Sequence, residues 1–551
     1  MSLSSNNSLD TTKKSNKEEK ILAKNTFYSL LTNSSNFLFS IITVFIIARL
    51  ISKDDWSILI LATSLVTIFS LALIFLPPSL GLSIIYYATE FKALNQNNKF
   101  KSFIKNSLIL RTLFGSIIFF ITILIFLTFE NFFTLNRKDY VIIFFLLSPQ
   151  IIMNGLSDVF NSAAQTLNMF KLNYILLLIK NAIYIGGLIL LYFFKSFIEV
   201  YHIAAAVIVS ILVPFIVQAV IILFILKFKI KKTEESKESL RDTFKKIYKY
   251  GSYLTVIDFS SAFNIEMTTQ LTGYYQPAST VTGYRIADRY RSIPSLTIAS
   301  IFRPLAIYFT RLVTNKQIDQ IKKAFNLLFN YLLTLMLIIT GVLFFSVEIF
   351  LVALYTESYL TFSTLVKVCL LIPIFTIQNS FFDGYFMATN KVKLLSIVSV
   401  GAMFLRLGFF TIGIVFFDIL VALYLVILEQ IIVFIVQILI LRRLNINLKI
   451  KKPLILYSSF FIALFTSWLL SSLFLNNIYV IILDNLGLSF FHYWNLPSII
   501  LYLLIFLGII IIFKVFTKSD IEKVESIFQK DNISHNIIRK ALNVSKKIMR
   551  G

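Results

Sequence analysis

Long apolar runs recur along almost the whole chain. A helix needs about 20 mostly apolar residues to cross the hydrocarbon core of a membrane, and about 14 runs of that length can be marked. The chain is 57% hydrophobic and only 15% charged, a composition that excludes an ordinary water-soluble domain. We therefore predict an all-α polytopic membrane protein.

The predicted spans fall into groups. The first six cover approximately residues 27–51, 57–76, 107–129, 140–168, 173–194 and 203–226. The other eight cover approximately 250–275, 281–309, 325–347, 361–388, 394–417, 419–441, 454–475 and 497–516. We predict a disordered tail (1–24), a six-helix lobe (25–226), a linker (227–249), a second six-helix lobe (250–441), an extra helix pair (442–516) and a basic tail (517–551).

Lysine and arginine in short loops mark the cytoplasmic side of a membrane protein. Alternating the spans from an inside N-terminus places the lysine-rich segments 13–24, 92–105, 227–249 and 442–452 on that side. The opposite side then holds only Lys53, Arg137, Lys138 and Lys195. We expect an even number of spans, both termini in the cytoplasm and a multi-pass location in the plasma membrane.

Five arginines lie inside or at the ends of apolar runs: Arg49, Arg285, Arg289, Arg303 and Arg406. A charge at the centre of a bilayer costs roughly 2.5–3.5 kcal/mol on insertion scales, so such a residue usually faces protein or a watery cavity. The planar guanidinium matches phosphate oxygens bidentately. The pattern favours a transporter whose cationic cavity takes a phosphate-bearing substrate.

The predicted span 281–309 carries three of these arginines. Arg285 and Arg289 are one helical turn apart on one face. Arg303 returns to the same angle about 27 Å further along the axis. The alternative is that these side chains reach the membrane surface or pair locally, Arg285 with Asp288.

Three further cations are candidates for the same cavity. Arg49 ends the first span and could instead anchor it at the interface. Lys180 lies within the fifth predicted span. Arg406 lies within the eleventh, and Glu429 of the twelfth is a possible partner that would neutralise it.

Carboxylates also lie inside predicted spans: Asp258, Glu266, Asp383 and Glu429. A carboxylate removed from water can exchange a proton, so these residues are candidates for coupling transport to protons or sodium. They are equally suited to act as counter-ions for the arginines. We expect no bound cofactor and no metal site.

Other chemistry is not indicated. The three histidines are far apart, and no glycine-rich phosphate loop is present, which argues against ATP hydrolysis. A single cysteine, Cys369, excludes a disulfide within the chain. The basic residues mark the inner leaflet and not nucleic acid.

Several stretches resemble the polysaccharide-exporter (Wzx-like) flippases of the multidrug/oligosaccharidyl-lipid/polysaccharide transporter superfamily. They are Ala48-Arg49-Leu50-Ile51, Lys53-Asp54-Asp55-Trp56, Leu80-Gly81-Leu82-Ser83, Leu271-Thr272-Gly273-Tyr274-Tyr275, Thr282-Gly283-Tyr284-Arg285-Ile286-Ala287 and Arg303-Pro304-Leu305. Ser57, where the family often has glycine, and Pro77-Pro78 depart from the pattern.

The resemblance implies export of a lipid-linked oligosaccharide by alternating access, with membrane lipids and other polysaccharide-assembly proteins as partners. It also implies a cationic central cavity for the phosphate and sugar head. A cation-coupled drug antiporter of the same superfamily is the alternative, although it should favour cavity carboxylates over arginines. A membrane glycosyltransferase or a polysaccharide polymerase fits less well, because the predicted outer loops are short. We therefore expect a transporter and not an enzyme.

Overall fold

The computed structural model describes most of the 551 residues. Besides Phe27, Tyr28, Leu31 and Thr32, the described ranges are 34–128, 138–194, 199–230, 236–295, 318–389, 391–443, 450–485 and 492–515. The regular structure within these ranges is helical, with one isolated β-bridge between Phe75 and Pro78. The chain divides into two compact units, Met1–Thr282 and Gly283–Gly551.

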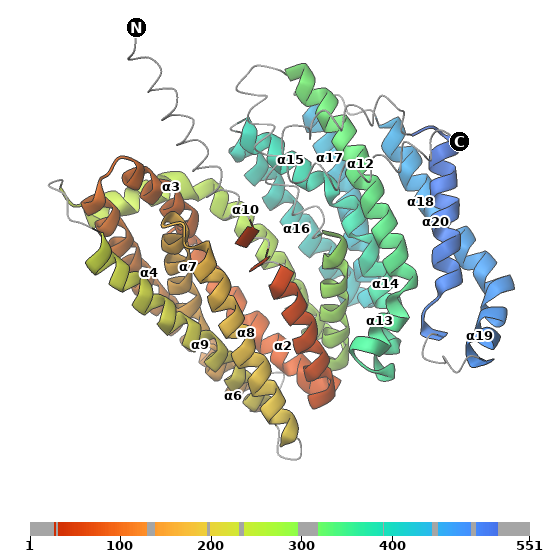
Figure 1. The fold of residues 1–551 in the computed structure, drawn as a ribbon, viewed down its shortest axis with the longest axis horizontal. Helices are drawn as coiled ribbons and strands as arrows, with labels where there is room; N and C mark the ends of the chain where they lie inside the picture. Colours follow the sequence, from red (N-terminus) through yellow and green to blue (C-terminus); the bar gives the residue numbers. More distant parts are fainter. Residues whose placement is uncertain are drawn as a thin grey trace, which may run out of the picture. The chain divides into compact units, whose positions relative to one another are not determined.

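The first unit contains a helix over residues 34–50 and eight labelled α-helices (Figure 1). These are α2 (Lys53–Phe75), α3 (Leu80–Ala93), α4 (Asn97–Thr128), α6 (Lys138–Leu147), α7 (Gln150–Thr166), α8 (Phe170–Phe193), α9 (Val200–Phe224) and α10 (Leu240–Tyr275). A helix over residues 278–295 crosses the boundary between the units.

The second unit continues with nine labelled α-helices. They are α12 (Ile318–Phe345), α13 (Val347–Leu354), α14 (Ser363–Leu371), α15 (Ile377–Ala388), α16 (Val392–Phe416), α17 (Ile419–Arg443), α18 (Lys451–Leu470), α19 (Asn476–Asn485) and α20 (Leu496–Ile512). Between α14 and α15 the tenth predicted span is interrupted by a short 3-10 turn, Pro373–Phe375, because proline cannot donate the helical hydrogen bond.

The all-α polytopic fold predicted from the sequence is confirmed. Among the described residues, ten segments are long and apolar enough to cross a membrane, and each coincides with a predicted span. The shorter apolar helices Ser34–Leu50 and Leu496–Ile512 coincide with the first and last predicted spans. The seventh and eighth predicted spans correspond to α10 and to the helix over 278–295, both of which carry several charges.

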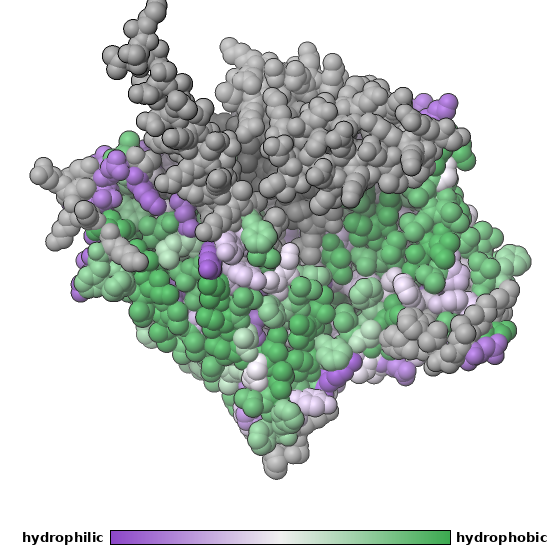
Figure 2. All heavy atoms as spheres, in the orientation of Figure 1, coloured by the Kyte–Doolittle hydropathy of each residue, from purple (hydrophilic) through white to green (hydrophobic). Residues whose placement is uncertain are grey.

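Much of the exposed surface of the helices is apolar, and several polar residues within them are buried. On α4, Phe120 and Leu124 are exposed, whereas Ser107, Arg111 and Thr122 are buried. Figure 2 shows hydrophobic residues over the flanks of the first unit and hydrophilic residues near the end where α3 meets α4. Such a distribution suits helices surrounded by lipid, where a polar group needs a partner inside the protein.

The start of α2 follows the capping rules. The Ser52 side chain accepts a hydrogen bond from the Asp55 backbone N–H at 3.1 Å, and Asp54 and Asp55 occupy the first turn of α2. Acidic residues are favourable there because the helix N-terminus carries partial positive charge. The Thr282 hydroxyl donates to the Lys53 carbonyl at 2.8 Å, which ties this turn to the helix over 278–295.

Helix α10 packs against α2, α3 and α4. The sequence prediction places its membrane part in the second lobe, whereas the boundary between the compact units falls after Thr282. Gly251 is what allows the close approach, because a Cβ atom there would collide with the Pro78 carbonyl oxygen. The turn between α2 and α3 is therefore held directly against α10.

The C-terminal helices α18 and α20 pack on one another and on α12. Tyr502 of α20 is fully buried, and its hydroxyl donates to the Leu337 carbonyl at 2.8 Å. Its ring occupies the space beside Gly341, where a Cβ would overlap the ring atoms. This interaction joins the predicted extra helix pair to the rest of the second unit.

Replacing Gly251 with alanine should destabilise the protein by about 1–3 kcal/mol, because the added methyl group overlaps a backbone oxygen that cannot move alone. Gly401→Ala is the matched control, since a Cβ at Gly401 of α16 meets nothing within 4 Å. Thermal unfolding in detergent should show a lower midpoint for Gly251→Ala and an unchanged or higher one for Gly401→Ala. Equal midpoints for the two variants would contradict this account of the packing.

Candidate functional site

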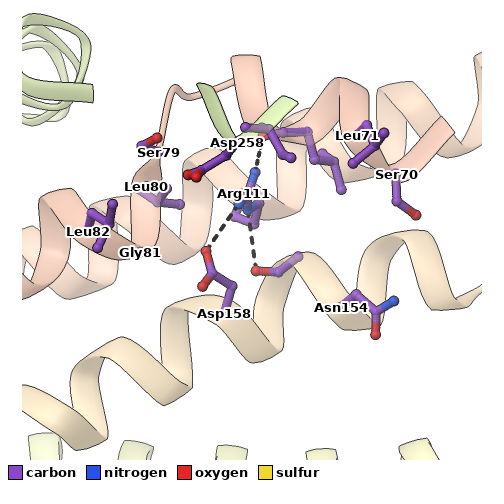
Figure 3. Close-up of a pocket in the computed structure, with 13 residues that line it drawn as sticks. Ser70, Leu71, Ser79, Leu80, Gly81, Leu82, Arg111, Asn154, Asp158 and Asp258 are labelled. Atoms are coloured by element: carbon purple, nitrogen blue, oxygen red, sulfur yellow. Dashed lines mark hydrogen bonds and ion pairs between the residues drawn. The ribbon is translucent and has the colours of Figure 1, made fainter. Parts of the chain in front are cut away.

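A cavity of about 340 Å³ lies inside the first unit. Residues of α2, α4, α7 and α10 and the start of α3 line it (Figure 3). Its polar lining consists of Ser70, Ser79, Arg111, Asn154, Asp158 and Asp258. Of these residues, only Asp258 is a site candidate that the sequence alone predicts.

Arg111 of α4 is the buried cation of this cavity, with a side chain 6% exposed. Its guanidinium donates to the Gly155 carbonyl at 3.3 Å and to the Leu73 and Leu76 carbonyls. It also forms an ion pair with Asp158 of α7 at 3.3 Å. Figure 3 shows the Arg111 side chain directed toward the Asp158 carboxylate. Arg111 thus joins three helices through one side chain.

The local sequence explains why Arg111 fits here. Helix α2 ends at Phe75, ahead of Pro77-Pro78, so its last carbonyls lack the helical donors that would follow. These carbonyls form the negative end of the helix dipole, which favours a nearby cation. Gly155 leaves room for the arginine stem, since a Cβ there would lie 3.1 Å from the Arg111 Cδ atom.

The two carboxylates give the cavity an acidic excess. The Asp158 side chain is 48% exposed and also accepts a hydrogen bond from the Gly81 backbone N–H. Asp258 of α10 is exposed and lies close enough for its charge to interact with that of Asp158. When all three groups are ionised, one guanidinium faces two carboxylates. This arrangement is suited to a small cation and not to a phosphate.

The predicted substrate cations of the first unit lie elsewhere. The Arg49 guanidinium lies 3.6 Å from the centre of the Phe45 ring and donates to the Phe45 carbonyl at 3.0 Å. Lys180 is exposed near the middle of α8. Neither residue lines the cavity that holds Arg111.

In the second unit, Arg285 is half-buried and Arg289 is exposed, one turn apart on the helix over 278–295. Asp288 forms an ion pair with Arg291 at 2.5 Å, which is not the pairing with Arg285 considered from the sequence. Both side chains of this pair are largely buried. Arg303 lies outside the described residues.

Arg406 of α16 pairs with Glu429 of α17, as one of the two sequence interpretations expected. The Arg406 Nε atom lies 3.3 Å from the Glu429 carboxylate, which also accepts a hydrogen bond from Gln430 at 2.6 Å. Glu429 is 1% exposed. A carboxylate bound in this way is a counter-ion and not an open site for a coupling ion.

The remaining predicted carboxylates lie on two different helices. Glu266 of α10 is half-buried, and its carbonyl accepts a hydrogen bond from Ser64 at 3.1 Å. Asp383 of α15 is half-buried in the second unit. Within the described ranges, no group of three or more His, Cys, Asp or Glu residues is placed to hold a metal ion.

Arg111 and Asp158 are the site residues that reasoning from the sequence missed. Both are charges within predicted membrane spans, residues 107–129 and 140–168, and that signal was available. Their pairing was not, because they are separated by 47 positions on different helices. In the predicted span 281–309, by contrast, the charges are close together in sequence.

Solved structures share this fold. A MATE-family multidrug transporter of the MOP superfamily, in an inward-facing conformation, has a TM-score of 0.59 at 12% identity, covering 74% of this chain and 93% of that one. The lipid II flippase MurJ, in an inward closed conformation, has a TM-score of 0.60 at 15% identity, covering 89% and 98%. A point mutant of the Vibrio cholerae MATE transporter VcmN has a TM-score of 0.56 at 13% identity, covering 77% and 97%. At these identities the likeness establishes the fold alone.

A search of curated protein sequences finds no match. A family model described as "Polysaccharide biosynthesis protein" matches residues 22–313, more than half of the chain. The matched region contains the Arg111 cavity and the helix that carries Arg285 and Arg289. The chain is therefore a multi-pass membrane protein that belongs to the polysaccharide biosynthesis protein family.

Proposed function

We propose that this protein is a flippase that moves a lipid-linked oligosaccharide from the inner to the outer leaflet by alternating access. The match to the polysaccharide biosynthesis family carries the proposal. The fold supports it, because it is shared with a lipid II flippase and with MATE transporters. The carrier would be a polyprenyl phosphate or pyrophosphate, whose head group must cross the hydrocarbon core with its charge neutralised.

Arg285 and Arg289 are the proposed ligands of the carrier phosphate. The two residues are one turn apart on one helix face, Arg285 half-buried and Arg289 exposed. Their planar guanidinium groups match phosphate oxygens bidentately. Arg49, Lys180 and Arg303 are secondary candidates for the same role. We assign Arg406 a structural role, since Glu429 already neutralises it.

Transport against a gradient requires an energy source, and the cavity around Asp158 and Asp258 is the proposed site for a coupling proton or sodium ion. Asp258 is the better candidate for exchanging the ion, because Asp158 is already paired with Arg111. A ligand shifts a conformational equilibrium only through different affinities for the two states. Binding at Asp258 would therefore have to differ between the inward-open and outward-open states.

We propose that the protein lies in the plasma membrane. The loop charges then place both termini in the cytoplasm. Export then runs from the lysine-rich side to the opposite side. In this orientation the lysines of the segments 92–105 and 227–249 would lie on the entry side.

A cation-coupled antiporter for small organic cations is the second candidate. The acidic excess of the cavity around Asp158 and Asp258 favours it, because carboxylates attract a cationic substrate as well as a coupling ion. The two candidates differ in what Arg285 and Arg289 do, since arginines repel a cationic drug.

Removing the two proposed phosphate ligands should abolish most flipping. In proteoliposomes containing a fluorescent polyprenyl-pyrophosphate oligosaccharide, Arg285→Ala/Arg289→Ala should reduce the initial rate by at least about tenfold, as expected when charge-assisted hydrogen bonds are lost. Arg443→Ala, at the exposed end of α17, is the control and should retain the wild-type rate. A normal rate in the double variant would exclude this phosphate site, and an inactive wild type would favour the antiporter.

Neutralising Asp258 should uncouple transport from its driving ion. Asp258→Asn keeps the size of the side chain and removes its charge, so flipping should lose its dependence on an imposed pH or sodium gradient. The measurement is the flipping rate with and without each gradient. An unchanged gradient response in Asp258→Asn would show that another carboxylate, such as Asp383, couples transport.

The Arg406–Glu429 pair should matter for stability and not for substrate affinity. Arg406→Leu alone should destabilise the protein by about 3–5 kcal/mol, because it leaves the buried Glu429 charge unpaired. Arg406→Leu/Glu429→Leu should recover most of that loss, measured by thermal unfolding in detergent. Flipping by the folded double variant at wild-type substrate affinity would fit a structural role, whereas weaker binding would assign Arg406 to the substrate site.

A further inference from the structure

Two tyrosines form an exposed stacked pair on the first unit. The rings of Tyr86 in α3 and Tyr250 in α10 are 4.6 Å apart between centroids, with an interplanar angle of 17°. Tyr86 is 51% exposed and Tyr250 is 37% exposed. Aromatic side chains normally bury their faces, so a pair that stays at the surface is available to a partner.

Neighbouring side chains hold this tyrosine pair in place. Tyr87 contacts Tyr250 edge-on, with centroids 6.0 Å apart, and packs on Phe103. The Lys246 ammonium lies 4.8 Å from the centre of the Phe91 ring and forms an ion pair with Glu238 at 2.6 Å. These contacts fix the start of α10 against α3. The two exposed rings are therefore preorganised, which lowers the entropy cost of binding.

The tyrosine pair continues one wall of the charged cavity. Leu82 lines the cavity and is itself exposed, and Tyr86 follows it four residues later on the same face of α3. Four residues advance a helix by about 6 Å. The pair is therefore next to the cavity rim, toward the end of α3 that carries Lys92 and against which Lys246 of α10 packs.

The chemistry of this surface matches a sugar ring. A pyranose presents a face of C–H groups that can lie on an aromatic ring, while its hydroxyls remain free to bond with water or with a tyrosine hydroxyl. The electron-rich face of an aromatic ring attracts such weakly positive hydrogens. A side chain that only anchors a helix at the membrane surface needs no stacked partner.

We propose that Tyr86 and Tyr250 form a platform that binds the saccharide part of the substrate as it enters from the lysine-rich side. This inference rests on the proposed flippase function and names a recognition element within it. The phosphate ligands would neutralise the carrier charge, and the tyrosine platform would select carriers that bear a glycan.

The test compares a carrier with and without sugar. The probes are fluorescent polyprenyl pyrophosphate carrying N,N′-diacetylchitobiose and the same lipid without the disaccharide, each in proteoliposomes. Tyr86→Leu/Tyr250→Leu should slow flipping of the glycosylated probe about tenfold and of the bare lipid less than about twofold. Tyr86→Phe/Tyr250→Phe retains the rings and should keep most activity. Tyr192→Leu, which removes an exposed tyrosine from α8, is the control.

A direct binding measurement separates this inference from the flippase proposal. Tyr86→Trp in detergent should show a saturable change in tryptophan fluorescence when titrated with soluble N,N′-diacetylchitobiose, even if no probe is flipped. Tyr192→Trp should show none. Equal slowing of both lipid probes by the leucine variant, or no saturable signal at residue 86, would overturn the platform.

Discussion

A buried guanidinium with several acceptors organises the first unit. Arg111 lies within an apolar helix and satisfies its donors with the Leu73, Leu76 and Gly155 carbonyls and the Asp158 carboxylate. A charge in such surroundings is tolerated only where the protein supplies its partners. Because those partners lie at the end of α2 and in the middle of α7, both helices must remain in register with α4. The cavity beside Arg111 exists only in that arrangement.

Within the described residues, the acidic cavity and the arginines of the helix over 278–295 belong to different units. The first unit holds an acidic cavity built on one arginine and two aspartates. In the second unit, the Arg406–Glu429 and Asp288–Arg291 pairs are largely buried, and the helix over 278–295 also carries the half-buried Arg285 and the exposed Arg289. This separation is compatible with the proposed function, since ligands for an anionic head group and for a coupling cation would neutralise each other if they were placed together.

The fold could be predicted largely from the sequence, because the length and spacing of apolar runs determine where helices cross a membrane. The pairing of Arg406 with Glu429 could also be proposed, since both residues lie within neighbouring predicted spans. The Arg111–Asp158 pair could not, because the pairing depends on how α4 and α7 pack and on where the last carbonyls of α2 lie. The partner of Arg291 was missed for a simpler reason: Asp288 is close to two arginines in sequence, and only the packing decides between them.

Helix α3 connects the charged cavity to the tyrosine pair. Near its start, the Gly81 backbone contacts the Asp158 carboxylate, and a little more than one turn later it carries Tyr86. A Cβ at Gly81 would overlap the Asp158 oxygens, so α3 and α7 are in direct contact at this point. A short helix moves as a rigid rod, and a displacement at the carboxylate end is therefore shared by the tyrosine end. Binding at the Asp158 cavity and binding at the tyrosine pair would therefore be coupled. A coupling free energy is reciprocal, so each ligand would change the affinity for the other by the same factor.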